Sequence, residues 1–299
     1  MILNDPAARP ARLAVGVVGA GRVGAVLGAA LRAAGHRVVA ASGVSARSRD
    51  RAETLLPEAE LLPAQDVMAR ADLVLLTVPD DALPALAAGL VAASAARPGQ
   101  LVVHCSGRYG VGVLEPLTRA GALPLALHPA MTFTGTSVDL SRLSGCAFGV
   151  TAPEPLLPIA EALVVEMGGE PQQVAEERRA LYHAALATAS NHLVTLAAES
   201  MDLLRSCGVE DPARLLGPLM AASLDNALRS GDAALTGPVA RGDAGTVAAH
   251  VAELAAVSTT TVAAYVAMAR LTADRALAAG TLKAAAAEAL LDVLSERRP

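Results

Sequence analysis

The chain has 299 residues, of which 53% are hydrophobic and 2% aromatic, and its formal net charge is −5 at pH 7. The length allows two domains of ordinary size, and the composition is that of a soluble enzyme. Mild acidity and few aromatic side chains exclude a nucleic-acid-binding protein, because both the positive surface and the stacking platform are missing. The cysteines Cys105, Cys146 and Cys207 lack the spacing of a disulfide framework or a metal site. We therefore expect no metal, a cytoplasmic location and, since no run free of charge or proline is long enough, no membrane span.

The N-terminal third has the pattern of a strand–helix–strand unit. Residues 1–12 contain two prolines and are predicted to form a flexible tail. The apolar run Leu13–Val18 predicts a buried strand, Arg22–Ala34 predicts a helix capped by Gly35, and His36–Ala41 predicts a second strand. A GxGxxG loop stands between the first strand and the helix, which is the context in which this motif binds a dinucleotide.

Each glycine of this loop has a separate predicted role. Gly19 makes the tight turn, Gly21 lets the backbone approach a pyrophosphate, and Gly24 allows the helix to pack closely on the strand. The phosphates are expected to meet the free N–H groups at the start of the helix, at Arg22 and Val23.

The end of the second predicted strand indicates which dinucleotide binds. An acidic residue there would hold the ribose hydroxyls of NAD(H), but the segment 42–49 contains none. It offers Ser42, Ser45, Arg47 and Arg49 instead, and hydroxyls and guanidinium groups complement a 2′-phosphate. We therefore expect NADP(H). The alternative is that Arg47 and Arg49 only solvate the start of the next helix.

Further predicted strands end in polar turns. The run 71–78 precedes Pro79, Leu101–His104 precedes Cys105-Ser106-Gly107, and Leu123–Leu127 precedes His128. The carboxyl ends of parallel strands share one edge, so these turns are expected to line a cleft beside the nicotinamide. Ser106 and His128 are the candidate reactive groups, with a purely structural His128 as the alternative, whereas His104 is predicted to be a strand histidine bonded to a backbone carbonyl. The residues expected to bind the cofactor are Gly19, Gly21, Arg22, Val23, Gly24, Ser42, Ser45, Arg47, Val78 and Pro79.

The pattern changes after a predicted strand at Cys146–Val150, a helix at Leu156–Met167 and a break at Gly168–Pro171. From Ala175 onward helical periodicity is nearly continuous, which predicts an all-α domain. The expected fold is thus a Rossmann domain with a parallel-rich sheet over residues 13–170, followed by a helical substrate and dimerisation domain over residues 171–299. Its Ala-rich helical segments, such as Val247 to Ala279, are too apolar for full exposure and predict a homodimer.

Two segments of the helical domain carry candidate catalytic residues. On a helix predicted from Glu176 to Cys207, His183, Ser190 and Asn191 share one side, facing either a cleft or a dimer seam. Further on, Arg241 lies between two glycine turns and can hold an anionic substrate or form an interdomain salt bridge. Asp243 suits the N-cap of the helix that follows.

The motifs GAGRVG, TVPDD, HCSG, HPAMTF, YHAALATASN and GPVARGD, in this order, resemble the Rossmann-like proteins followed by the domain of unknown function numbered 2520. The resemblance covers nearly the whole chain, and HPAMTF and GPVARGD are specific to it. This layout is similar to those of the 6-phosphogluconate and β-hydroxyacid dehydrogenases, pyrroline-5-carboxylate reductase and ketopantoate reductase. It implies a dinucleotide domain followed by a helical, often dimeric domain, and ketopantoate is the most concrete substrate it suggests.

One departure concerns the proton donor. Hydroxyacid dehydrogenases of this layout carry a lysine and an asparagine one helical turn apart on the first long helix of the second domain. Asn191 matches the asparagine, but Ala187 stands at the lysine position. His183, one turn earlier, is the candidate replacement, because a histidine can give a proton to a carbonyl oxygen that receives hydride.

The sequence therefore predicts an NADP-dependent reductase of a small 2-oxo acid, with its site at the interdomain cleft. His183 or His128 would supply the proton, Asn191 and Ser106 would orient the carbonyl, and Arg241 would hold a carboxylate of the small anionic substrate. Two alternatives stay open: a cyclic imine reductase, and a non-catalytic NADP(H)-binding sensor or scaffold.

Overall fold

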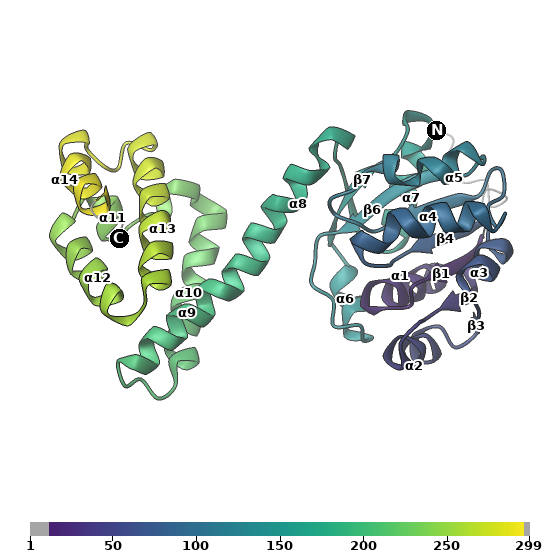
Figure 1. The fold of residues 1–299 in the computed structure, drawn as a ribbon, viewed down its shortest axis with the longest axis horizontal. Helices are drawn as coiled ribbons and strands as arrows, with labels where there is room; N and C mark the ends of the chain where they lie inside the picture. Colours follow the sequence, from purple (N-terminus) through teal and green to yellow (C-terminus); the bar gives the residue numbers. More distant parts are fainter. Residues whose placement is uncertain (1–11, 296–299) are drawn as a thin grey trace, which may run out of the picture. The chain divides into compact units, whose positions relative to one another are not determined.

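The computed structural model describes residues 12–295, which form two compact units that meet in sequence at Ser190 and Asn191 (Figure 1). The predicted tail at residues 1–12 lies, except for Arg12, outside the described residues. Every helix within residues 12–295 is too short or too polar to span a membrane.

A sheet of eight strands in the order β3-β2-β1-β4-β5-β6-β7-β8 forms the centre of the first unit. Neighbouring strands are parallel except for the pair β6 and β7, so the predicted α/β class with a parallel-rich sheet is confirmed. The strands are β1 (Ala14–Val18), β2 (Arg37–Ser42), β3 (Glu60–Leu61), β4 (Leu73–Leu76), β5 (Leu101–His104), β6 (Leu123–Pro129), β7 (Ala147–Thr151) and β8 (Glu170–Gln173).

Successive side chains of a strand point to opposite faces of the sheet, and here both faces carry apolar residues. Helices therefore cover both faces. Val15 and Val17 pack with α1 and α7 on one face, while Val18 and Val74 pack with α3, α4 and α5 on the other. The helices of this unit are α1 (Arg22–Ala33), α2 (Ala46–Leu55), α3 (Ala64–Arg70), α4 (Leu83–Ala92), α5 (Glu115–Arg119), α6 (Val138–Leu143), α7 (Leu157–Glu166) and α8 (Arg179–Ala187).

The structure differs from the sequence prediction at three strands. The short edge strand β3 was not predicted, and β8 lies where a break was expected at Gly168–Pro171. Both pair on one side only and carry polar residues, so they lack the apolar signal of a buried strand. Strand β6 extends to Pro129 because β7 pairs with it antiparallel, with His128 opposite Gly149.

The second unit is all-helical, as predicted, and packs around Val239, Val247, Ala273 and Leu290. Its helices are α9 (Leu193–Ser206), α10 (Pro212–Ser230), α11 (Pro238–Arg241), α12 (Ala244–Val257), α13 (Thr259–Ala278) and α14 (Ala284–Ser295).

Two predicted long helices are interrupted, and one predicted cap is confirmed. The segment Val247 to Ala279 breaks at Ser258, whose extended backbone ends α12 and whose Oγ accepts a bond of 3.3 Å from Thr261 N to begin α13. The helix predicted from Glu176 to Cys207 contains a π-helical turn at Thr188–His192, which includes Ser190 and Asn191. Asp243 caps α12 by accepting from Thr246 N at 3.2 Å.

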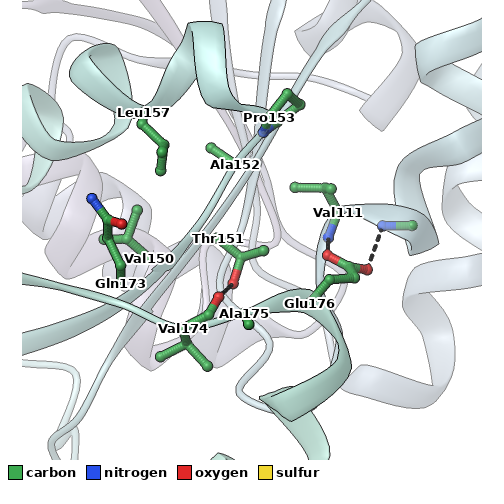
Figure 2. A pocket seen from close by; sticks show the side chains of 11 residues that line it. Val111, Val150, Thr151, Ala152, Pro153, Leu157, Gln173, Val174, Ala175 and Glu176 are labelled. Atoms are coloured by element: carbon green, nitrogen blue, oxygen red, sulfur yellow. Dashed lines mark hydrogen bonds between the residues drawn. The ribbon is translucent and has the colours of Figure 1, made fainter.

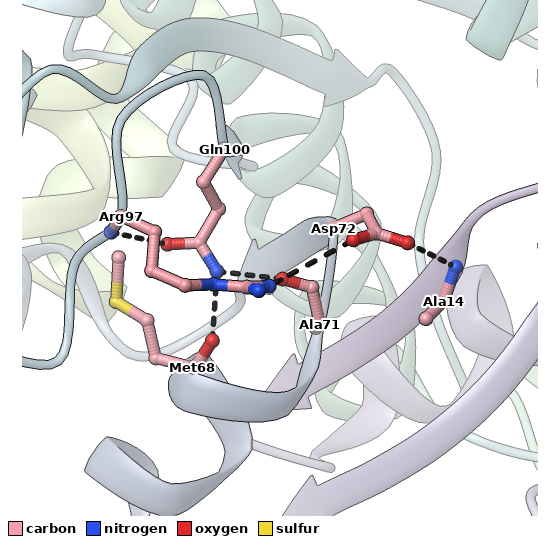
Figure 3. A network of polar contacts seen from close by, with 6 residues as sticks. All are labelled: Ala14, Met68, Ala71, Asp72, Arg97 and Gln100. Carbon is pink, nitrogen blue, oxygen red and sulfur yellow. Dashed lines mark hydrogen bonds and ion pairs between the residues drawn. The ribbon is translucent and has the colours of Figure 1, made fainter.

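A buried glutamine precedes β5, at the end of the sheet opposite the carboxyl ends of the parallel strands, and bonds to the end of α3 (Figure 3). Gln100 is 3% exposed, and its Nε2 donates to the carbonyl oxygens of Met68 and Ala71, each at 2.7 Å. Arg97 also donates to Ala71 O and lies 3.7 Å from a carboxylate oxygen of Asp72. The end of α3 and the start of β5 are therefore joined by side-chain hydrogen bonds, two of them buried.

We predict that Gln100→Ala lowers the free energy of unfolding by about 1–3 kcal/mol, because it removes two buried hydrogen bonds and leaves a cavity. The matched control is Gln173→Ala, which removes an exposed hydrogen bond of 2.7 Å to Glu161 and should cost less than about 0.5 kcal/mol. Urea unfolding followed by circular dichroism compares the two. Equal effects would show that the Gln100 bonds do not stabilise the sheet.

Candidate functional site

The glycine loop between β1 and α1 has the geometry of an anion-binding turn. Gly19 has a φ of +92°, and Gly21 N donates to Gly19 O at 2.7 Å, which closes a tight turn before α1 begins at Arg22. Within residues 12–295 no side chain caps the first turn of α1, and that turn contains no acidic residue. The N–H groups of this helix are therefore available to phosphate oxygens.

The third glycine of the motif is required by the neighbouring strand. A β-carbon at Gly24 would overlap Thr77 Oγ1 and Gly19 O. Thr77 Oγ1 donates to Gly19 O at 2.8 Å, so the turn after β4, which continues into Val78 and Pro79, is tied to the glycine loop. The residues of this region thus fit a dinucleotide, because the backbone is held open for a pyrophosphate.

A second concave region lies at the carboxyl ends of β2 and β3. Ser42 Oγ accepts from Gly19 N at 3.1 Å, while Ser45 caps α2 by accepting from Ser48 N at 3.1 Å. Arg47 is exposed, and Arg49 donates to Val44 O at 2.9 Å. A cavity of about 330 Å³ is lined by Ser42, Gly43, Val44, Arg49, Leu61, Leu62, Pro63 and Ala64. Of the residues predicted to select the cofactor, Ser42 and Arg49 line this cavity, whereas Ser45 and Arg47 lie beside it in sequence.

A cluster of aromatic polar side chains stands at the carboxyl ends of β5 and β6. His128 Nδ1 is 3.0 Å from Tyr182 Oη, and the rings of His128 and His183 meet edge to face with centroids 5.9 Å apart. A β-carbon at Gly107 would lie 2.6 Å from His183 Cδ2 and 3.0 Å from His128 Nε2. The turn after β5 therefore approaches both histidines closely, which only a glycine permits. We call His128, Tyr182 and His183 the histidine cluster.

Beneath the histidine cluster lies a buried arginine. Arg179, at the start of α8, is 1% exposed. Its Nε donates to Tyr109 O at 2.9 Å, its Nη1 to Gly149 O at 3.1 Å, and its Nη2 to Ser106 O. Its charge lies 5.5 Å from the centre of the Tyr182 ring. No carboxylate among the described residues forms an ion pair with it.

Burial and this arginine determine the protonation of the histidines. Burial lowers the pKa of His128 to about 4, with further contributions from the positive charge of Arg179 and from His183 and His104. Burial also lowers the pKa of His104 to about 4, although its hydrogen bond to the Gly110 carbonyl acts in the opposite direction. Both imidazoles are therefore neutral near pH 7.

The other predicted residues are placed as follows. His104 Nε2 lies 2.9 Å from Gly110 O, as expected for a strand histidine. Ser106 is 7% exposed, and its Oγ accepts from Tyr109 N at 3.2 Å. Ser106, His128 and His183 are thus brought together in the first unit. Asn191 and Arg241 are exposed residues of the second unit, and Arg241 donates to Thr236 O.

Three residues of this region were not predicted from the sequence: Arg179, Tyr182 and Glu176. Arg179 follows an exposed arginine, Arg178, and no pattern in the sequence shows which of the pair is buried. Tyr182 could have been predicted as a site residue, since it begins the motif YHAALATASN and directly precedes His183.

Glu176 belongs to a separate cavity of about 670 Å³ (Figure 2). Its carboxylate accepts from Val111 N at 2.8 Å and from Gly112 N at 3.0 Å. The cavity is lined mainly by apolar side chains and backbone at the ends of β7 and β8. None of the predicted catalytic residues lines it, so we do not assign the reaction to this cavity.

The sheet order, with β1 between β2 and β4, and the glycine loop at the carboxyl end of β1 define a fold of the Rossmann class. The family models agree: residues 3–129 match a Rossmann-like domain, and residues 146–272 match the domain of unknown function DUF2520. The chain thus carries a Rossmann-like domain followed by a DUF2520 domain. No curated protein matches the sequence.

Solved structures with the same fold include a candidate NADP oxidoreductase from Bacteroides fragilis, with 23% identity and a TM-score of 0.71 over 88% of this chain and 98% of that one. A protein from Thermotoga maritima has 24% identity and a TM-score of 0.66 over the same shares. A pyrroline-5-carboxylate reductase from Coxiella burnetii has 15% identity and a TM-score of 0.54 over 95% of this chain and 99% of that one. The first of these is named for an NADP oxidoreductase and the third for a reductase, and at these identities the likeness shows the fold alone.

We predict that Gly24→Ala weakens NADPH binding at least about tenfold, because the new methyl group pushes α1 away from the glycine loop. Gly89→Ala is the matched control: a β-carbon at this position of α4 would meet no neighbouring atom within 4 Å, so the change should leave affinity unchanged and raise stability slightly. Fluorescence titration with NADPH measures both variants. Unchanged binding by folded Gly24→Ala protein would contradict the assignment of this loop.

Proposed function

We propose that this protein is an NADP(H)-dependent reductase of a small 2-oxo acid. The observation that carries the proposal is the histidine cluster, which lies at the same edge of one sheet as the glycine loop. Strand ends at this edge are where open α/β sheets bind ligands and carry reactive groups. Ketopantoate is the substrate that we would test first.

NADP(H) is favoured over NAD(H) by the residues around the cavity at the ends of β2 and β3. Ser42 and Arg49 line it, and it contains no acidic residue that would repel a 2′-phosphate. One bond from Arg49 goes to Val44 O, but a guanidinium has five N–H donors and keeps others for a ligand. Arg47 and Ser45 remain candidates for the same phosphate.

The proposed reaction needs a hydride for the carbonyl carbon and a proton for the carbonyl oxygen. When bound, a reduced nicotinamide supplies the hydride that adds to the substrate carbonyl carbon. Because His128 is neutral near pH 7, His183, which is partly exposed, supplies the proton to the carbonyl oxygen, while His128 and Ser106 orient that oxygen. Asn191 and Arg241 keep their proposed roles in orienting the carbonyl and holding the substrate carboxylate.

Reduction of a cyclic imine is the second candidate, and the low pKa of His128 favours it. An imidazole that stays neutral down to about pH 4 is a weak acid catalyst at neutral pH. An imine that arrives protonated needs no such acid.

The deciding assay follows NADPH oxidation with ketopantoate, other 2-oxo acids and cyclic imines. Turnover of one class identifies the reaction. Tight NADPH binding without turnover would favour the non-catalytic sensor or scaffold.

We predict that His183→Ala and Asn191→Ala each lower kcat about 100-fold or more, because each removes a group proposed to act on the carbonyl. NADPH affinity should stay within about twofold. The matched controls are His250→Ala and Asn226→Ala, which change exposed residues of α12 and α10. Equal and slight effects on kcat in all four variants would reject both catalytic roles.

We also propose that the chain forms a homodimer through its helical unit, because α9 and α10 expose large apolar side chains. Leu219 is 60% exposed and Leu228 is 80% exposed. Sedimentation should give twice the monomer mass, and the double change Leu219→Asp with Leu228→Asp should shift it to the monomer. Val165→Asp, which changes a residue 61% exposed on α7, should not. A monomeric wild-type protein would contradict the proposal.

A further inference from the structure

The two ring nitrogens of His128 have different surroundings. Nδ1 lies 3.0 Å from Tyr182 Oη in a partly buried contact. Nε2 lies next to Gly107, in the turn after β5, where a β-carbon would come within 3.0 Å of it. One nitrogen is thus occupied by Tyr182 of α8, and the other packs against Gly107 in the turn after β5.

The bond between His128 and Tyr182 has a preferred direction. A phenol hydroxyl is a better donor than acceptor, and an unprotonated imidazole nitrogen is a better acceptor than a phenol oxygen. Tyr182 therefore donates to Nδ1, which leaves the single proton of a neutral His128 on Nε2. Gly149 permits this arrangement, since a β-carbon there would lie 2.6 Å from Tyr182 Oη.

The surroundings of His128 also oppose a second proton. From α8 it is faced by Arg179, Tyr182 and His183, and from β5 by His104. The only permanent charge in this set is the positive charge of Arg179, whose hydrogen bonds go to neutral carbonyl groups.

The carboxylate of Glu176, just before α8, forms no ion pair with Arg179. Glu176 is held by the N–H groups of Val111 and Gly112 instead. An imidazolium at His128 would therefore be buried beside a second positive charge, which is unfavourable.

We propose that Tyr182 and Arg179 are positioning residues that hold His128 as a neutral imidazole with its proton on Nε2. The assignment of this N–H to a substrate oxygen rests on the proposed function. A neutral N–H polarises a carbonyl through a hydrogen bond without giving up its proton, so the proton added to the oxygen comes from His183. His128 and His183 then have different tasks although their rings touch.

The test observes His128 directly, in the full chain without substrate. Protein labelled with ¹⁵N-histidine is titrated with acid and followed by long-range ¹H–¹⁵N NMR, which distinguishes the two neutral tautomers from the imidazolium. We expect the wild-type His128 to be the Nε2–H tautomer from pH 8 down to about pH 5, in keeping with its pKa of about 4. A proton on Nδ1, or an imidazolium at pH 7, would overturn the proposal.

Three variants separate the two positioning roles. Tyr182→Phe removes the hydroxyl bonded to Nδ1 and should give a mixture of tautomers. Arg179→Met removes the nearby positive charge and should raise the pKa of His128 by about one unit. Arg179→Lys keeps the positive charge and should leave the pKa near the wild-type value. Tautomer and pKa unchanged in folded Tyr182→Phe and Arg179→Met would also reject the proposal.

His36 reports whether the variants remain folded, because its Nδ1 accepts from Leu13 N at 3.1 Å and its Nε2 lies 2.8 Å from Glu166. If a variant loses this His36 signal, it is unfolded, and the proposal is then judged by the tautomer of His128 in the wild-type protein alone.

Activity is a separate readout. The expected tautomer without turnover on any substrate would reject the proposed function and leave this inference standing. With turnover, Tyr182→Phe should lower kcat more than it changes KM.

Discussion

The arrangement of the first unit around its reactive groups depends on the buried guanidinium of Arg179. Burying a charge costs several kcal/mol unless hydrogen bonds compensate for the lost water. Three carbonyl groups do so here, from the turn after β5, from the loop that follows it and from β7. Because these segments are distant in sequence, one side chain at the start of α8 fixes the relative positions of all of them.

The same charge sets the electrostatic character of the site. It contributes to the low pKa of His128 and His104, so the strand ends present neutral imidazoles around a fixed cation. Such a site attracts an anion without any lysine, which agrees with the proposed carboxylate substrate. The glycine loop at β1 likewise presents N–H groups and no acidic side chain in the first turn of α1. Both parts of this sheet edge therefore suit negatively charged ligands.

The sequence predicted the elements that repeat a strong local pattern. The β1–α1–β2 unit, the strand Leu101–His104 and the Asp243 cap have side-chain periodicity or turn chemistry that acts over a few residues. It could not predict β8, which is polar and pairs with a single neighbour, or the break at Ser258, where one serine among many alanines and threonines ends a helix. Arg179 was missed for a related reason: its role comes from carbonyls 30 to 73 residues away, and no local pattern records such contacts.

The two edge strands restrict how copies of this protein can associate. A sheet edge with unpaired N–H and C=O groups invites another strand to join it, which leads to aggregation. Here β3 has only two residues, and β8 carries Pro171, which has no N–H to donate, among glutamate and glutamine side chains. Extension of the sheet is thus discouraged at both ends. Self-association of folded copies by strand pairing is therefore less favourable than contacts between side-chain surfaces, which can be specific and closed.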